Sequence, residues 1–256
     1  MKALRLLIFS IILLPIVSGC DKFRSNIQPG VVLSFDDASI DAWMQADSLL
    51  KPYGWKATFF VSNIAVLDNS QIAKLQKLKA EGHEIGGHGF HHVNAISYSK
   101  KHGSDGYLYD EINPMIKRMA QYNLLPASFS YPFGDRTAST DKVLFEKFLM
   151  LRGTTYGKKS PAKQTCYYDG SQLINGLGLD YSYDHFSIPY FISLLRYAKN
   201  HHKIVIFYGH KTVENATGEY ETEFKTLEEI CQYVQSNHMK FYTTRELYDL
   251  SHRRNK

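Results

Sequence analysis

Short apolar runs alternate along the chain with longer segments whose apolar residues recur at helical spacing. Eight of these runs predict strands, at residues 31–35, 57–61, 84–87, 128–131, 148–152, 172–177, 204–208 and 240–243. The runs are mainly apolar rather than alternating, which is typical of strands in a parallel sheet that is covered on both faces. The pattern therefore predicts a parallel sheet between helical layers.

Amphipathic helical patterns fill the intervals between these strands. One begins near Ser39 and places Trp43 and Leu49 on one face, and a second runs from Ser70, which resembles a helix cap, to Gly82. Four more cover about residues 108–123, 139–147, 187–200 and 226–237. Seven or eight strand-then-helix units in one chain favour a (β/α) barrel over an open sheet.

Composition indicates a folded protein and argues against one class of function. The 256 residues are 44% hydrophobic and 14% aromatic, which supports a substantial core in one large domain or two small ones. The formal net charge of +5 is modest and no block of lysine and arginine stands out, so nucleic-acid binding is not indicated. The 18 tyrosines fit contact with carbohydrate, although tyrosine also serves in ordinary half-buried positions.

The N-terminus has the anatomy of an export signal. A basic start precedes an apolar stretch at residues 6–17, which is too short to span a bilayer as a mature helix. The stretch ends in Val17-Ser18-Gly19-Cys20, which resembles the bacterial lipobox, where the cysteine becomes the first mature residue and carries lipid. We therefore expect an exported bacterial lipoprotein, anchored through Cys20 to a cell-envelope membrane. An ordinary signal peptide or an N-terminal anchor is the alternative. The expected boundaries are a signal peptide at 1–19, a tether at 20–28 and one folded domain at 29–256.

Two motifs point to a metal-dependent reaction. Ser34-Phe35-Asp36-Asp37 ends the first strand in adjacent carboxylates, and His88-Gly89-Phe90-His91-His92 spaces two imidazoles four residues apart. Together they offer one carboxylate and two histidines to a divalent ion, with an open ligand position typical of catalytic zinc. The second carboxylate can then serve as a base. Each motif alone also has an ordinary explanation, since aspartates cap helices and histidines occur on solvated helix faces.

Several polar groups follow predicted strands, and this agreement supports the barrel. Active-site groups of (β/α) barrels lie at the C-terminal ends of the strands. Asp36-Asp37, His88, Pro132-Phe133 and His210 all fall at such positions. An ionisable histidine directly beyond an apolar strand is unexpected for packing and suits chemistry.

Other histidines and cysteines are interpreted as lying outside the reacting groups. His83 and His91 do not share the four-residue spacing, so His83 is taken as structural or supporting and His91 as a non-ligand. Cys166 and Cys231 lie far apart in sequence, and either a disulfide or two buried free thiols fits an exported protein.

The motifs and their order resemble the polysaccharide deacetylases that carry a NodB-homology domain, carbohydrate esterase family four. The resemblance runs from about Pro29 to Leu250. It implies a distorted, seven-stranded (β/α) barrel in the α/β class, with residues 29–256 as the catalytic domain. The first motif implies Asp36 as the catalytic base and Asp37 as a metal ligand, and the second implies His88 and His92 as further metal ligands.

Three later segments match the remaining motifs of that family. Ser130-Tyr131-Pro132-Phe133-Gly134 is similar to the third motif and implies that the Phe133 backbone N–H holds the oxyanion. Leu177-Gly178-Leu179-Asp180-Tyr181 is similar to the weak fourth motif and implies that Asp180 orients the catalytic histidine. Ile206-Phe207-Tyr208-Gly209-His210 is similar to the fifth and implies His210 as the general acid.

Two positions depart from the family pattern. Gly89 stands where serine or threonine is usual and removes a hydroxyl that would steady the loop. Ser130 stands where the third motif often has an arginine that holds the base carboxylate. Arg136 and Arg152 are candidate substitutes, and the sequence does not distinguish them.

The resemblance implies a metal-dependent hydrolase that removes N-acetyl groups from an acetylated amino-sugar polysaccharide or oligosaccharide and releases acetate. Zn²⁺ is the expected ion, with Co²⁺ or Ni²⁺ as alternatives. Three other functions stay open: an O-acetyl glycan esterase of the same fold, a glycan-binding pseudoenzyme suggested by Ser130 and Gly89, and a metal-dependent phosphoesterase. The absence of a basic cluster or a glycine-rich phosphate loop counts against the last. The identity of the glycan, the membrane leaflet and the oligomeric state stay open.

Overall fold

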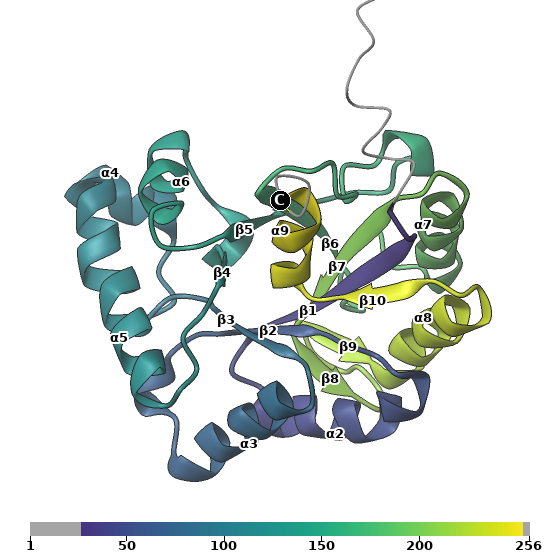
Figure 1. Ribbon diagram of the computed structural model, residues 1–256, viewed down its shortest axis with the longest axis horizontal. Coiled ribbons are helices and arrows are strands. Elements are labelled where there is room, and N and C mark those ends of the chain that lie inside the picture. The colour runs from purple at the N-terminus through teal and green to yellow at the C-terminus, as the bar shows by residue number, and fades with distance from the viewer. Residues whose placement is uncertain (1–26, 253–256) are drawn as a thin grey trace, which may run out of the picture.

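Seven parallel strands pair in chain order and close into a barrel in the computed structural model, which describes residues 27–252 (Figure 1). The strands are β1 (Gly30–Asp37), β2 (Thr58–Val61), β3 (Glu84–Gly87), β4 (Ser128–Ser130), β5 (Met150–Thr155), β6 (Leu173–Gly178) and β7 (Ile204–Gly209). β7 pairs back with β1, which closes the ring. An eighth strand, β10 (Lys240–Tyr242), pairs with the first residues of β1, while β2 pairs with its second half. The predicted seven-stranded (β/α) barrel is confirmed.

Helices surround the barrel and connect successive strands (Figure 1). They are α2 (Ile40–Leu50), α3 (Asn69–Ala80), α4 (Ala95–Tyr107), α5 (Asn113–Gln121), α6 (Ala138–Leu144), α7 (Ile188–Asn200), α8 (Phe224–Ser236) and α9 (Thr244–His252). Shorter pieces are the 3₁₀ turns at Lys51–Tyr53, Ile64–Val66, Pro132–Gly134 and Pro161–Lys163, and a π-helical turn at Leu108–Ile112 that joins α4 to α5. A small parallel pair, β8 (Lys211–Val213) and β9 (Glu221–Glu223), follows β7.

The eight predicted strands are all present, and no end is shifted by more than three residues. The expected cap of the second helix is wrong. Asp68 rather than Ser70 caps α3, because its carboxylate accepts a hydrogen bond from the Gln71 amide while the Gln71 side chain accepts one from the Asp68 amide. The structure adds α4, α9 and the β8–β9 pair, which were not predicted.

Alternate residues of each strand face two different environments. On β1, Val31, Leu33 and Phe35 belong to the large apolar cluster shared with the surrounding helices. Val32 belongs to a second cluster that lines the inside of the barrel with Met150, Tyr168, Ile174, Ile204, Ile206, Tyr242 and Leu247. The interior is therefore apolar toward the N-terminal ends of the strands.

The N-terminal end of the barrel is closed by α9. Its first backbone amides donate to groups on the strands: Thr244 N–H to Thr58 Oγ1 at 2.9 Å and Arg245 N–H to Glu84 Oε2 at 2.7 Å. These bonds satisfy helix amides that have no partner within α9.

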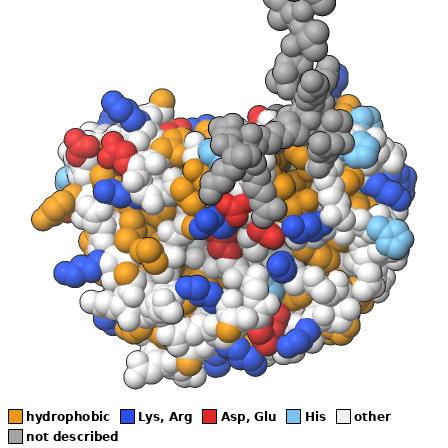
Figure 2. Space-filling model, viewed as in Figure 1, with side chains coloured by type: hydrophobic (Ala, Val, Ile, Leu, Met, Phe, Trp, Pro, Cys, Tyr) orange, Lys and Arg blue, Asp and Glu red, His pale blue; other side chains and the backbone are white. Residues whose placement is uncertain are grey.

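The surface drawn in Figure 2 carries lysine, arginine and acidic side chains scattered among uncharged ones, without one continuous patch of either sign. Within residues 27–252, no helix is long and apolar enough to cross a membrane. The expected signal peptide at 1–19, the lipid-bearing Cys20 and most of the tether at 20–28 lie outside the described residues.

Candidate active site

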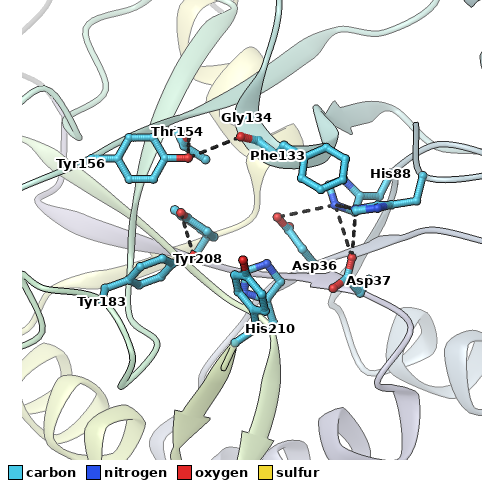
Figure 3. A pocket seen from close by; sticks show the side chains of 12 residues that line it. Asp36, Asp37, His88, Phe133, Gly134, Thr154, Tyr156, Tyr183, Tyr208 and His210 are labelled. Atoms are coloured by element: carbon cyan, nitrogen blue, oxygen red, sulfur yellow. Dashed lines mark hydrogen bonds and ion pairs between the residues drawn. The ribbon is translucent and has the colours of Figure 1, made fainter. Parts of the chain in front are cut away.

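A cavity of about 270 Å³ opens at the C-terminal ends of the strands (Figure 3). It is lined by Asp36, Asp37, His88, His92, Phe133, Gly134, Thr154, Tyr156, Tyr183, Tyr208, His210 and Tyr220. Figure 3 shows Asp36 and Asp37 projecting into the cavity, with His88 on one side and His210 on the other. Six of the seven site residues predicted from the sequence thus meet in one cavity, and the seventh, Asp180, lies behind His210.

Asp37, His88 and His92 form a cluster that could hold a metal ion. Asp37 Oδ1 lies 3.6 Å from His88 Nε2 and 3.2 Å from His92 Nε2, and the two Nε2 atoms are 3.2 Å apart. Ligand atoms about 2.0–2.1 Å from a tetrahedral ion are separated by about 3.3 Å. The three separations therefore fit one small divalent cation.

The protonation of His88 also fits a metal ligand. Burial lowers the pKa of His88 to about 4, so the ring is neutral at ordinary pH. Its Nδ1 lies 2.8 Å from the Ser130 carbonyl oxygen, which accepts a hydrogen bond from Nδ1–H. Nε2 therefore presents its lone pair toward Asp37 and His92, as in metal sites where a backbone carbonyl fixes the ligand tautomer.

Asp37 combines an unusual backbone conformation with a lowered side-chain pKa. Its φ is +81°, and the φ of His92 is +59°. Two of the three candidate ligands therefore have a left-handed backbone conformation, which residues other than glycine rarely adopt. Strain of this kind concentrates at functional sites. Burial would raise the pKa of Asp37, but the hydrogen bond from His92 and the nearby His88 lower it to about 2. The carboxylate is thus available as an ionised ligand.

Asp36 is buried and held by Arg152. The Arg152 guanidinium donates to Asp36 Oδ2, and its side chain is only 1% exposed. Ser130 Oγ lies between them, accepting from Arg152 and lying 3.5 Å from Asp36 Oδ2. Asp36 Oδ1 is buried and makes no hydrogen bond within the described part of the chain. The predicted base is therefore fixed through Oδ2, which also lies 3.8 Å from His88 Nε2.

The two arginines left open by the sequence have different partners. Arg136 pairs with the carboxylate of Asp141 on α6. Arg152 lies on β5 and is the one that reaches Asp36. The structure therefore selects Arg152 as the residue that faces Asp36 in place of an arginine at Ser130.

His210 and Asp180 form a buried pair. Asp180 Oδ2 lies 2.6 Å from His210 Nδ1, and Asp180 Oδ1 accepts from the His210 amide at 3.2 Å and from the Thr222 hydroxyl. Burial disfavours the charged imidazolium, but the hydrogen bond and charge of Asp180 outweigh it, and the pKa of His210 is raised. Asp180 therefore favours the protonated form of His210 at the edge of the cavity.

Phe133 occupies a strained turn beside the cluster. Its φ is +62°, within the 3₁₀ turn Pro132–Gly134, and its ring lies 4.9 Å from that of His92 between centroids. Among residues 27–252, no partner is found for the Phe133 N–H, whereas the neighbouring Gly134 N–H donates to the Tyr131 carbonyl. A free backbone donor at this place could stabilise negative charge in the cavity.

Glu111 supports the loop that carries His88 and His92. It lies in the π-helical turn, and its Oε1 accepts from the His91 and Val93 amides at 2.7 and 3.3 Å. Its Oε2 lies 3.0 Å from His91 Nδ1. A Cβ at Gly89, where φ is +89°, would lie 2.7 Å from Glu111 Oε1. Glycine at this position therefore makes room for the carboxylate that steadies the loop.

Several lining residues were not predicted. Tyr156, Tyr183, Tyr208 and Tyr220 surround the cavity, and Tyr208 donates to Tyr183 Oη at 3.0 Å. Only Tyr208 carried a usable signal, since it stands two residues before His210 on the predicted strand. The others come from loops that the sequence does not place.

The remaining histidines and cysteines lie outside the cavity. His83 is buried against Asp47, with 2.8 Å between Nε2 and Oδ1, and accepts the Ala57 amide through Nδ1. His91 turns toward Glu111 rather than toward the cluster. Cys166 and Cys231 are both buried and free, which is the second of the two alternatives for these residues.

Fold and cavity together define a class of protein. It is a seven-stranded (β/α) barrel in which one carboxylate and two histidines lie together at the C-terminal ends of the strands, beside a second carboxylate and a third histidine. The sequence from residue 24 to 147 matches the Polysaccharide deacetylase family. This match, over residues 24–147, confirms the resemblance that the motifs predict.

Solved structures share the fold at low sequence identity. The chitin deacetylase of the fungal pathogen Colletotrichum lindemuthianum has a TM-score of 0.58 and 16% identity, covering 86% of this chain and 88% of that one. A family 4 acetyl xylan esterase from Clostridium thermocellum, in complex with a cobalt ion, has a TM-score of 0.57 and 19% identity, with 86% and 90% covered. A peptidoglycan deacetylase from Bacillus subtilis has a TM-score of 0.55 and 16% identity, with 89% and 93% covered. No curated protein matches the sequence.

Proposed function

We propose that this protein is a metal-dependent hydrolase that removes N-acetyl groups from acetylated amino-sugar glycans. The observation that carries the proposal is the placement of Asp36 beside the Asp37–His88–His92 cluster, with the His210–Asp180 pair lining the same cavity. This arrangement supplies a metal site, a base and an acid, which hydrolysis of an amide requires.

A divalent ion held by Asp37, His88 and His92 would polarise the acetyl carbonyl and lower the pKa of a bound water. Asp36, whose Oδ2 lies 3.8 Å from His88 Nε2, takes a proton from the attacking water. The Phe133 N–H donates a hydrogen bond to the oxygen that gains negative charge, a contact whose loss typically costs about 10²–10³ in kcat. His210 donates a proton to the departing sugar nitrogen, and Asp180 stabilises the imidazolium until then. The products are acetate and a free amino sugar.

The acid favours N-acetyl over O-acetyl substrates. An amine leaves an acyl centre only after its nitrogen is protonated, and Asp180 raises the pKa of His210, so that the ring keeps its proton to higher pH than a free imidazole. Two of the similar structures are a chitin deacetylase and a peptidoglycan deacetylase, while a third is an acetyl xylan esterase. O-acetyl xylan is therefore the comparison substrate in any assay.

A pseudoenzyme is less well supported than an active enzyme. The two departures that suggested it, Ser130 and Gly89, each have a compensating contact. Arg152 holds Asp36 where an arginine at position 130 is missing, and Glu111 holds the loop beside Gly89.

The test is the loss of metal and activity together. Asp37→Ala should abolish both bound zinc and acetate release from N-acetylglucosamine oligosaccharides, while His91→Ala should retain both, because His91 turns away from the cluster. Metal content by elemental analysis and acetate by a coupled assay give the two readouts. Undiminished turnover by the Asp37 variant would contradict the assignment.

We also propose, from the sequence alone, that the chain is an exported lipoprotein held on a cell-envelope membrane through Cys20. Acyl chains on one cysteine would anchor the protein without a spanning helix. Cys20→Ala should move the protein from the membrane fraction to the soluble fraction of the envelope. Retention of that variant in membranes would favour an N-terminal anchor instead.

A further inference from the structure

The carboxylate of Asp180 is held from two segments of the chain. His210 reaches it twice: Nδ1 of the ring lies 2.6 Å from Oδ2, and the backbone amide donates to Oδ1 at 3.2 Å. The hydroxyl of Thr222, on β9, donates to the same Oδ1. Asp180 and Thr222 are both fully buried, and within residues 27–252 Thr222 is the one residue besides His210 that hydrogen-bonds to this carboxylate. The orientation of the carboxylate therefore depends on a strand outside the predicted motifs.

The strand that carries Thr222 is itself anchored to two other elements. Its register partner on β8 is Thr212, whose hydroxyl donates to a backbone carbonyl of α2 at 2.7 Å. The Tyr181 amide donates to the Glu221 carbonyl at 2.9 Å, which ties β9 to the residue directly after Asp180. The Thr222 hydroxyl is thus fixed by its backbone and can hold the carboxylate in one orientation.

Gly209, at the end of β7, leaves the space that this hydrogen bond needs. A Cβ at position 209 would overlap Thr222 Oγ1 and would lie 3.3 Å from Asp180 Oδ1. A side chain there would push the hydroxyl away from the carboxylate. The glycine directly before His210 therefore permits the contact between Thr222 and Asp180.

We infer that Thr222 is a positioning residue for the acid: its hydroxyl fixes the Asp180 carboxylate so that Oδ2 is aimed at His210 Nδ1, and the imidazolium is thereby held where it protonates the leaving nitrogen. The inference rests on the proposed deacetylase function. Thr222 is not among the residues that line the cavity, so it acts through Asp180. Without the hydroxyl, Oδ1 keeps only the His210 amide, and the carboxylate can turn about its Cβ–Cγ bond. Misplacement of a reacting group lowers kcat.

The leaving group provides a readout that separates this role from a purely structural one. An amine must be protonated as it leaves, so hydrolysis of an N-acetyl group depends on His210. The leaving group of 4-nitrophenyl acetate is a weak base and departs without a proton. Misplacement of the acid should therefore slow hydrolysis of the amide and spare the aryl ester, whereas general damage to the site should slow both.

The experiment compares Thr222→Val and Thr222→Ser with the wild-type protein on N-acetylglucosamine oligosaccharides and on 4-nitrophenyl acetate, per mole of folded, zinc-loaded protein. Valine keeps nearly the shape of threonine and removes its hydroxyl. Thr222→Val should lower kcat on the oligosaccharides about 10–10²-fold with KM little changed, and should keep kcat on the aryl ester within threefold. Thr222→Ser retains a hydroxyl and should keep kcat on both substrates within threefold.

Thr212→Val is the matched control, because Thr212 is also buried in the β8–β9 pair but its hydroxyl bonds to a backbone carbonyl rather than to Asp180. It should keep kcat on both substrates within twofold. If Thr222→Val does not fold, Thr222→Ala is compared with Thr212→Ala, and the same difference between substrates is expected. If the wild type does not accept the aryl ester, the ratio of kcat between Thr222→Ser and Thr222→Val on the oligosaccharides decides.

The outcomes separate this inference from the proposed function. A wild-type protein that releases no acetate from the oligosaccharides with zinc bound overturns both. An active wild type whose Thr222→Val variant keeps kcat on the oligosaccharides within twofold overturns this inference alone. An equal loss on the two substrates, or a Thr222→Ser variant as slow as Thr222→Val, also overturns this inference and leaves the proposed function standing.

Discussion

Two carboxylates lie at opposite ends of the barrel, the half-buried Glu84 and the buried Asp36, and their hydrogen bonds differ. Glu84, near the N-terminal end, is saturated: Oε1 accepts from Ser128 Oγ at 2.5 Å, and Oε2 accepts from Thr58 Oγ1 and the Arg245 amide at 3.1 and 2.7 Å. Asp36, at the C-terminal end, accepts through Oδ2, and its Oδ1 has no hydrogen-bond partner among residues 27–252. Glu84 is held by neutral groups, whereas Asp36 faces a guanidinium.

The difference separates a structural carboxylate from a reactive one. Burial raises the pKa of Glu84, and its donors tie β2, β3 and β4 to the start of α9. Asp180 and Glu111 resemble Glu84, since each accepts bonds through both oxygens. Asp36 lines the cavity and its Oδ2 lies 3.8 Å from His88 Nε2, so it is the carboxylate that we assign to proton transfer, whereas the saturated carboxylates position other groups.

Replacement of the Asp36 carboxylate should have the largest effect on activity. Asp36→Asn keeps the shape of the side chain but removes the base, so kcat should fall about 10²–10⁴-fold. Acetate release under saturating substrate measures the loss, with bound zinc as a check that the neighbouring Asp37 still binds. Asp41→Asn, an exposed residue on α2, serves as control. If the Asp36 variant retained more than a tenth of the wild-type kcat, the assignment of Asp36 as a reactive rather than a structural carboxylate would be wrong.

Replacement of Asp180, the hydrogen-bond partner of His210, should weaken His210 as the acid and shift the pH dependence of kcat. Because Asp180 raises the pKa of His210, the protonated acid is present below that pKa and is lost as pH rises through it. Asp180→Asn removes the raising interaction, so the alkaline fall in kcat should move to lower pH. At neutral pH kcat should drop about 10²–10³-fold.

A pH–rate profile measures the change, with the exposed Asp184→Asn as control. An alkaline limb at the same pH in the wild type and the Asp180 variant would show that Asp180 does not support His210.

Removal of the charge of Glu111, which supports the His88–His92 loop, should lower metal affinity more than it lowers kcat. Glu111→Gln turns one acceptor into a donor that faces the backbone amides of His91 or Val93 or the His91 ring. Residues that support metal ligands typically change affinity by about 10–100-fold. Zinc affinity by chelator competition should weaken by that amount. Asp110→Asn, whose side chain accepts from Tyr98 at the surface, should leave zinc affinity unchanged.

Glu84 should give the smallest effect on activity and a clear effect on stability. Glu84→Ala leaves its buried donors without an acceptor, which should lower the free energy of unfolding by about 2–3 kcal/mol. The kcat of the folded fraction should stay within twofold. Urea denaturation and acetate release measure the two, and Glu81→Ala on the surface is the control. A large fall in the kcat of the Glu84 variant with an unchanged free energy of unfolding would contradict the structural role assigned to Glu84.

Much of the fold could be predicted because the barrel strands are continuous apolar runs. β3 was predicted with its observed ends, and β1 and β7 within one to two residues. α4 was missed because its residues are largely polar and include Gly103 and Gly106, so no apolar stripe marks it. The β8–β9 pair was missed because three-residue strands carry little pattern.

The reacting groups could be predicted where they are close in sequence, and their supports could not. Asp36, Asp37, His88 and His92 belong to two short motifs at strand ends. Arg152 could not be distinguished from Arg136, because the choice depends on the register between β4 and β5.

Glu111 gave no signal, since it reaches the His88–His92 loop from a π-helical turn 20 residues beyond His91. Contacts between distant segments depend on tertiary packing, which a linear pattern does not record.

The most direct test of the account is acetate release from N-acetylglucosamine oligosaccharides by the purified protein, measured as isolated, after removal of metal by a chelator, and after return of zinc. Activity that disappears with the metal and returns with zinc, and that exceeds the activity on O-acetyl xylan, is the predicted result. Acetate release that persists after verified removal of the metal, or its absence at saturating zinc, would contradict the assignment of Asp37, His88 and His92 as the catalytic metal site.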